Sequence, residues 1–93
     1  GWWRDATFGT HADAWAAALV APLDEPGERA DLAATVLAWL RRHGQVDAAA
    51  ADLGVHRHTV RHRLRRAESL LGRSLDDAGV RAELYLALTR LPD

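Results

Sequence analysis

The feature that most constrains this sequence is one glycine, Gly54, between two helix-favouring runs in residues 46–66. Leu53 and Val55 flank it, so one residue that tolerates positive φ lies between two apolar residues, which predicts a tight turn between two helices. The run before the turn, residues 47–52, holds four alanines between two aspartates. Alanine favours a helix and leaves no bulky side chain to hold a neighbour away. We therefore expect the second helix to cross the first closely.

The run after the turn predicts an amphipathic helix over residues 57–71. Its apolar side chains recur at spacings of four, three and four residues, which is the period of a buried helical stripe. The stripe consists of Val60, Leu64, Ala67 and Leu71. Rotation by about 100° per residue places polar side chains on the opposite side. That outward side consists of His58, His62, Arg65 and Ser69, with Arg57, Thr59, Arg61 and Arg66 on its shoulders.

The outward side of this helix is basic. From Leu53 to Ala67 there is no acidic residue, but there are five arginines and three histidines. The whole chain has a net charge of −1, but the charge is unevenly distributed. Residues 1–40 carry two arginines and six acidic residues. Residues 41–73 carry eight arginines and three acidic residues, and residues 74–93 carry two arginines and four acidic residues. A helix that needs only solvation usually mixes both signs of charge. The basic centre between acidic flanks therefore predicts an anionic partner.

Several pieces of the sequence occur in a characteristic order: TVLAWL, HGQV, AAADLGVHRHTVRHRL, LLGRSLDD and LYLALTR. Together they resemble the C-terminal helix-turn-helix domain of PucR/CdaR-type bacterial transcription regulators, over roughly sixty of the 93 residues. The turn alone also resembles the Fis-type helix-turn-helix. The resemblance implies sequence-specific binding of duplex DNA, and it implies an amino-terminal sensory region elsewhere in the regulator that binds a metabolite.

The sequence departs from the family pattern at three positions. His58 stands where the family commonly has Asn, His62 where it commonly has Tyr, and Gln45 where it often has Asn. Because His58 and His62 lie on the outward side of the second helix, the family's base preference does not carry over to this chain.

In a helix-turn-helix unit the first helix crosses the phosphate backbone, and the second lies in the major groove with its amino-terminal half toward the bases. Arg61 is the predicted base reader, because Arg can bond bidentately to guanine. His58 and His62 are predicted to contact bases or phosphates. The full predicted interface is His56, Arg57, His58, Thr59, Arg61, His62, Arg65 and Arg66, of which Arg57, Thr59, Arg65 and Arg66 are assigned to phosphates.

Three further arginines each keep two interpretations. Arg63 lies only about 60° from the buried stripe, so it either contacts an acid inside the domain or joins the basic side. Arg41 and Arg42 end the preceding helix. They either offset the negative end of that helix dipole or contact a phosphate.

The rest of the chain completes an all-α fold of about five helices, because no strand-like alternation occurs. We expect an irregular or briefly helical start, a first helix from His11 to about Ala21 ended by Pro22, and a loop over residues 23–27. The second helix is expected over residues 28–43 and ended by Gly44. Its buried side is predicted to consist of Leu32, Val36, Trp39 or Leu40, and His43.

The last helix is expected over residues 78–90, after a cap by Asp76 or Asp77. One face of it carries Val80, Leu84, Ala87, Leu88 and Leu91, and Tyr85 lies off that stripe. This helix either closes the core or supplies a dimer interface. We divide the chain into a lead-in, residues 1–27, and a helix-turn-helix domain, residues 28–93, with the helix-turn-helix unit at 46–71 and the supporting helix at 77–91.

Composition argues against other classes of protein. The chain has no cysteine, which excludes disulfides and thiol chemistry. His58 and His62 have the spacing of a metal pair, but no carboxylate or cysteine follows at ligand spacing, so we expect no metal and no cofactor. Thr59 lacks an orienting acid and no glycine-rich phosphate loop occurs, so we expect no enzyme.

No apolar run approaches the ~20 residues of a membrane span, and the first residues do not open a secretory signal. We therefore expect a cytoplasmic bacterial protein. A homodimer is expected, since one short reading helix buries too little DNA surface to find a genomic site. The alternative function is a helical interaction module whose basic face binds an acidic protein or RNA.

Overall fold

The computed structural model describes residues 6–23 and 29–90, and all the regular structure in these ranges is helical. The fold is therefore all-α, as the sequence predicts. The elements are α1 (Ala6–Val20), the 3-10 helix η2 (Ala21–Leu23), α2 (Arg29–Arg41), α3 (Val46–Leu53), α4 (Arg57–Leu71) and α5 (Ala78–Arg90). None of the described helices is long and apolar enough to cross a membrane.

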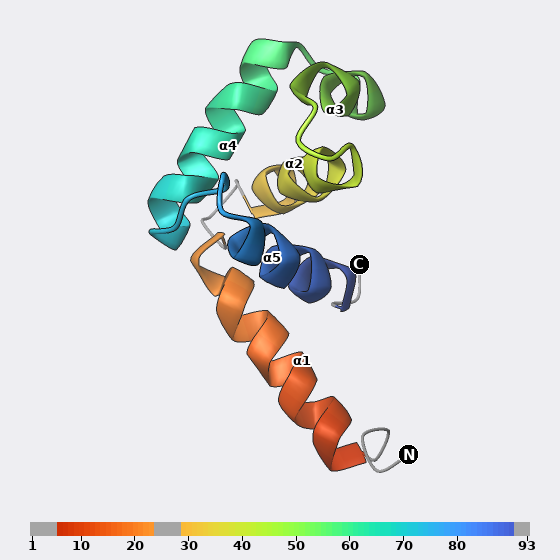
Figure 1. Ribbon diagram of the computed structural model, residues 1–93, viewed down its shortest axis with the longest axis vertical. Coiled ribbons are helices and arrows are strands. Elements are labelled where there is room, and N and C mark those ends of the chain that lie inside the picture. The colour runs from red at the N-terminus through yellow and green to blue at the C-terminus, as the bar shows by residue number, and fades with distance from the viewer. Residues whose placement is uncertain (1–5, 24–28, 91–93) are drawn as a thin grey trace.

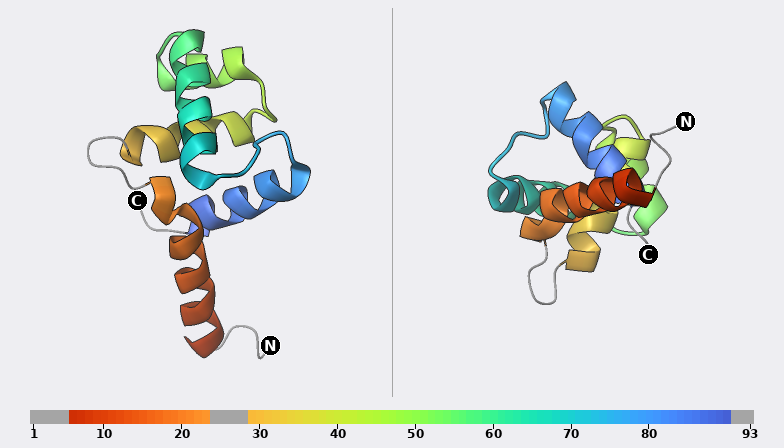
Figure 2. Two further views of the ribbon diagram at one scale, coloured as in Figure 1. Left: turned by 90° about the vertical axis from the view of Figure 1, so that its left-hand side faces the viewer. Right: turned by 90° about the horizontal axis from the view of Figure 1, so that it is seen from below.

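The helices form a bundle from which α1 projects (Figures 1 and 2). α2 lies in the middle of this bundle and packs against α3, α4 and α5. α1 packs against α5, and η2 packs against α4. Because α2 packs against α3, α4 and α5, it fixes the orientation of the helix-turn-helix unit relative to α5.

One core joins all of these elements. Val20 and Leu23 are buried at the end of the first helical segment, and Thr35 is the one polar residue buried among the described side chains. The other buried side chains are Ala16, Leu32, Val36, Trp39, Ala49, Ala50, Val60, Leu64, Ala67, Leu75, Val80, Leu84 and Ala87. The predicted stripes of α4 and α5 therefore face this core, although Leu71 and Leu88 are only half-buried, and Leu91 lies outside the described residues.

The observed helix boundaries agree best with the predicted ones where a glycine or a capping residue marks the end of the helix. α4 and α5 have the predicted bounds, and α4 ends at Gly72, whose φ is 66°. Asp77 caps α5, because its Oδ1 accepts a hydrogen bond from the Val80 amide at 3.0 Å. α1 instead begins at Ala6, five residues before the predicted start at His11. Part of the segment that we expected to be irregular or briefly helical therefore belongs to this helix, and Gly9 lies within it.

His43 corrects the prediction for α2. We expected it on the buried side of a helix reaching residue 43, but α2 ends at Arg41 and His43 is exposed. The chain leaves the helix through two left-handed residues, His43 with φ 54° and Gly44 with φ 81°. The Gly44 amide closes this turn by donating to the Trp39 carbonyl at 2.9 Å. The turn carries the His43 ring away from the core.

Candidate nucleic-acid interface

The turn between α3 and α4 has the geometry predicted from its glycine. Gly54 ends α3 with φ 69° and ψ 33°, and the Val55 amide donates to the Ala50 carbonyl at 3.1 Å. An added Cβ at Gly54 would meet no atom within 4 Å, so the glycine is required by its backbone conformation and not by crowding. Ala49 and Ala50 are buried in the core that also contains Val60. The small alanines thus allow the close crossing expected from the sequence.

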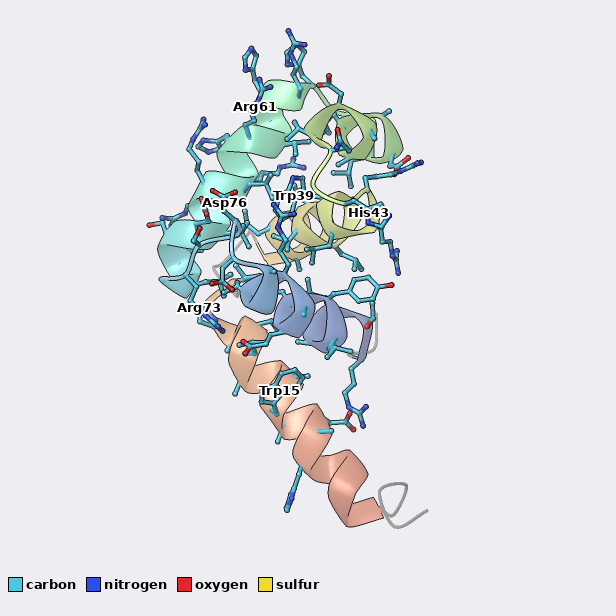
Figure 3. The ribbon with its side chains drawn as sticks, viewed as in Figure 1. Trp15, Trp39, His43, Arg61, Arg73 and Asp76 are labelled. Atoms are coloured by element: carbon cyan, nitrogen blue, oxygen red, sulfur yellow. The ribbon has the colours of Figure 1, made fainter. Side chains whose placement is uncertain are left out.

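The structure brings the eight predicted interface residues together at the start of α4 and along its length. Arg61 lies in the half of α4 away from the bundle's α1 end, and Arg73 follows the opposite end of the helix (Figure 3). Six of the eight are exposed: His56, Arg57, His58, Arg61, His62 and Arg65. Thr59 and Arg66 are half-buried, and Arg66 takes part in an interaction within the chain.

His56 has a structural role that the sequence did not indicate. It is the N-cap of α4, and its ring Nδ1 accepts a hydrogen bond from the His58 amide at 3.1 Å. The rings of His56 and His58 stack with their centroids 4.8 Å apart. A neutral imidazole that accepts at Nδ1 carries its proton at Nε2. His56 therefore offers an N–H donor at the exposed end of the helix.

Glu68, the one acidic residue in α4, is used inside the domain. It is half-buried, and its Oε2 accepts a hydrogen bond from the Leu75 amide at 2.8 Å. This contact ties the end of α4 to the segment that leads into α5. The carboxylate therefore adds no negative charge to the outward side at the amino-terminal half of α4.

Arg63 faces the neighbouring helix. It is half-buried, and its guanidinium donates to the hydroxyl of the buried Thr35 in α2 at 3.4 Å. Of the two interpretations, this geometry favours the structural one, because the guanidinium is directed into the domain toward α2. Arg63 joins α4 to α2 and is separate from the exposed arginines.

Arg42 forms an ion pair that sequence spacing does not predict. Its Nε and a terminal nitrogen donate to the two carboxylate oxygens of Asp52 at 2.6 and 2.8 Å. The hydrogen bond from Arg42 is the main cause that lowers the pKa of Asp52, helped by charge attraction and opposed by desolvation. The pair joins the end of α2 to α3. Arg42 is thus paired within the protein, although both Arg41 and Arg42 are exposed.

Arg81 holds α5 against α2 on the side away from the basic surface. Its guanidinium lies 4.4 Å from the centroid of the Trp39 ring, and its Nε donates to the Leu75 carbonyl at 2.6 Å. A terminal nitrogen lies 3.9 Å from the Asp76 carboxylate. Figure 3 shows Trp39 and Asp76 near each other where α2, α4 and α5 meet.

Within residues 6–23 and 29–90, no group of three or more histidine and acidic side chains converges as metal ligands would. His58 and His62 keep the spacing noted in the sequence, but their exposed neighbours Arg57, Arg61 and Arg65 are cationic. Such a surface suits an anionic partner better than a cation.

The short α3, the glycine turn and the long exposed α4 define the fold as a helix-turn-helix domain. Comparison with protein families matches residues 32–89 to the PucR C-terminal helix-turn-helix domain. The chain belongs to this family.

Two curated relatives extend this result. The chain is 48% identical over 62 residues to the "Uncharacterized protein in pkwA 5'region" of Thermomonospora curvata, covering 67% of this chain and 34% of that protein. It is 44% identical over 54 residues to the purine catabolism regulatory protein of Bacillus subtilis (strain 168), covering 58% of this chain and 10% of that protein. The chain therefore spans about a third and a tenth of the lengths of these relatives. No solved structure matches it.

Proposed function

We propose that this chain is the DNA-binding effector domain of a bacterial PucR-like transcription regulator, which places α4 in the major groove of duplex DNA. The observation that carries the proposal is the exposed, acid-free amino-terminal half of α4, directly after a tight turn from α3. Family membership supports a DNA-binding regulatory role for such a domain. We further propose that it acts in the cytoplasm, as a homodimer and together with an amino-terminal sensory region, rather than as an enzyme.

Exposure and position suggest which residues would contact bases and which would contact phosphates. Arg61 is exposed on the amino-terminal half of α4, which suits a bidentate bond to guanine. His58 and His62 are exposed beside it and would contact bases or phosphates. His56, with an N–H at the exposed start of the helix, would donate to a phosphate oxygen. The remaining phosphate contacts would come from Arg57, Thr59, Arg65 and Arg66.

The half-buried state of Thr59 and Arg66 supports their assignment to the backbone of DNA. Both lie at the margin between the exposed side of α4 and the core. A side chain at this margin would reach the edge of a groove, where phosphates lie, more readily than the bases at its floor.

We also propose that the helix-turn-helix domain begins after residue 27. The start of the family match nearby, at residue 32, supports this boundary.

The first test is binding to a labelled random-sequence duplex at two salt concentrations, with single-stranded DNA and RNA as competitors. We expect duplex to be preferred and affinity to fall steeply with salt, with a slope of about −0.9 for each phosphate neutralised. Because a monomer would bind weakly, a tandem chain joined by a flexible linker is measured in parallel. In this assay Arg61→Ala should lower the affinity. Arg73→Ala removes the same charge beyond the end of α4, where Arg73 pairs with Glu83, so it is the control and should leave the affinity unchanged.

The same experiment separates the proposal from its alternative. Competition by RNA as strong as by duplex DNA would favour RNA as the partner of the basic face. If neither the single chain nor the tandem chain binds duplex DNA, α4 is not a DNA-reading helix, and an acidic protein becomes the expected partner.

A further inference from the structure

The last part of α1 and the η2 segment after it carry almost no polar side chains. Residues 14–23 read AWAAALVAPL, without a single charged or hydrogen-bonding side chain except the indole of Trp15. One side of this segment is covered, because Ala16, Val20 and Leu23 are almost fully buried. A helix that is apolar on all sides is normally covered on all sides. The other side of α1 is therefore the unusual one.

That outer side is exposed and continues onto α5. Trp15 is 42% exposed and Leu86 of α5 is 59% exposed. Between the two helices lies a mostly apolar open groove of about 440 Å³, lined by His11, Ala12, Trp15, Leu86 and Arg90. Monomeric proteins seldom leave apolar side chains clustered in this way, and such clusters mark interaction sites.

We propose that the outer side of α1, together with Leu86, is the interface of the homodimer, an inference that rests on the homodimer in the proposed function. A two-fold interface presses one surface against itself, so a large side chain on that surface fits best where the same face also carries a small one. Trp15 and Ala18 meet this requirement, because they are three positions apart and so lie one above the other on the helix. In an antiparallel pair of α1 helices, Trp15 of one copy packs over the partner's Ala18.

Small residues also allow the two helices to approach. Ala14 and Ala18 are exposed on the outer side of α1, to which Trp15 also belongs. With alanine in these places the two backbones can come close and bury the Trp15 ring between them, where an aromatic side chain contributes much of its contact area. Longer side chains would hold the copies apart.

The charges near the groove favour a second copy over a strongly charged partner. The Nε of Arg90 in α5 lies 2.9 Å from a carboxylate oxygen of Asp13 in α1. This pair balances one base against one acid within each copy, so two copies do not repel each other there. Trp15 lies on α1, well away from Arg61 on α4 (Figure 3), so the interface leaves the basic side of α4 exposed.

The test is the association state of the 93-residue chain, measured by analytical ultracentrifugation over a wide range of protein concentration. We expect a monomer–dimer equilibrium. Ala18→Glu should raise the dimer dissociation constant at least about tenfold, because it buries an unpaired carboxylate in the interface from each copy. Ala34→Glu is the matched control, since Ala34 is an exposed alanine of α2 outside the groove. It should leave the dissociation constant unchanged.

A second variant protects the test from folding defects. Leu86→Gln changes a side chain that is already mostly exposed, so it should keep the helical circular dichroism spectrum and still weaken the dimer. A parent chain that stays monomeric at every concentration would overturn the proposal and leave the face to a different protein. A dimer that Ala18→Glu and Ala34→Glu weaken equally would also overturn it. DNA plays no part in these measurements, so they are independent of the proposed DNA binding.

Discussion

α1 and α4 are both 15 residues long, and both expose one side, but the two exposed sides differ in chemistry. The outer side of α4 carries arginine and histidine, whereas the outer side of α1 carries alanine and Trp15. A basic surface attracts an anionic partner at long range and remains well solvated without one. An apolar surface gains free energy only when it is covered. One domain thus presents two surfaces suited to two kinds of partner.

The comparison also shows how differently the two helices are held. α4 is attached by Val60, Leu64 and Ala67 in the core and by polar contacts from Arg63 and Glu68. α1 is attached by its buried apolar residues and by the ion pair of Asp13 with Arg90. Exposed ion pairs contribute only about 0–1 kcal/mol, so the position of α1 depends mostly on apolar packing against α5.

The substitution with the largest expected effect tests whether the α1 region and the α4 region fold as one unit. Leu84 is 1% exposed on α5, the helix that packs against both α1 and α2. Leu84→Ala should lower the free energy of unfolding by about 2–5 kcal/mol, through lost burial and the cavity left behind. Urea unfolding followed by tryptophan fluorescence and by helical circular dichroism should still show one shared midpoint.

Leu86→Ala is the control for this prediction, because it removes the same atoms from an exposed position on the same helix. Measured in dilute solution, it should change the free energy of unfolding by less than about 0.5 kcal/mol. Two separate transitions in Leu84→Ala would mean that the α1 region and the α4 region are independent units.

The next effect concerns the basic surface. Arg61→Ala should weaken binding to a selected DNA site by about 1–3 kcal/mol and weaken non-specific binding less, because it removes a base contact. Arg65→Ala should weaken both kinds of binding alike, because it removes a phosphate contact. Titrations of selected and random duplexes with each variant measure the two losses. Equal losses for Arg61→Ala would remove this residue from the base-reading role.

A smaller effect should come from the exposed histidines. Each of His58 and His62 is exposed on α4 and can donate a ring N–H to a phosphate oxygen. The double variant His58→Ala, His62→Ala should therefore weaken binding to a duplex roughly two- to fivefold, as expected for the loss of a weak hydrogen bond. His43→Ala, in the turn after α2, is the control and should leave the affinity unchanged. Equal affinities of the double variant and the parent chain would place the two histidines away from the DNA.

The smallest effect concerns the pair that joins α2 to α3. The pKa of Asp52 lies below its ordinary value, mainly because Arg42 donates a hydrogen bond to it. A carboxyl whose folded pKa is lowered stabilises the fold above its unfolded pKa and loses this contribution as the pH falls through the folded pKa. Asp52→Asn should therefore unfold at slightly lower urea concentration than the parent near neutral pH. The two midpoints should converge as the pH falls through the lowered pKa of Asp52, and a constant difference would assign the effect to something other than the charge.

Local pattern was enough to predict much of this fold. The bounds of α4 and α5, the turn at Gly54 and the cap by Asp77 agree with the sequence, because each depends on residues within a few positions of each other. The start of α1 and the end of α2 were predicted less well. In α2 the helical period continues to His43, but a turn that closes on Trp39 interrupts it.

The grouping of the eight candidate residues was predictable for the same reason, although their contact with DNA stays a proposal. The eight residues lie on consecutive turns of one helix or at its cap, so the helical period alone places them together. The cap made by His56 could not be predicted, since histidine is not among the usual capping residues. The paired role of Arg42 was also missed, because it depends on how α2 and α3 cross.

By itself the sequence determined the helices, the tight turn and the basic side of α4, because these follow from short-range periodicity and from the sign of charge. The tertiary structure alone decided that Arg63 meets Thr35, that Arg42 meets Asp52, and that Trp15 lies beside Leu86. These partners are far apart in the chain, and no helical or strand period relates them. Only the crossing of packed helices brings such side chains to one place.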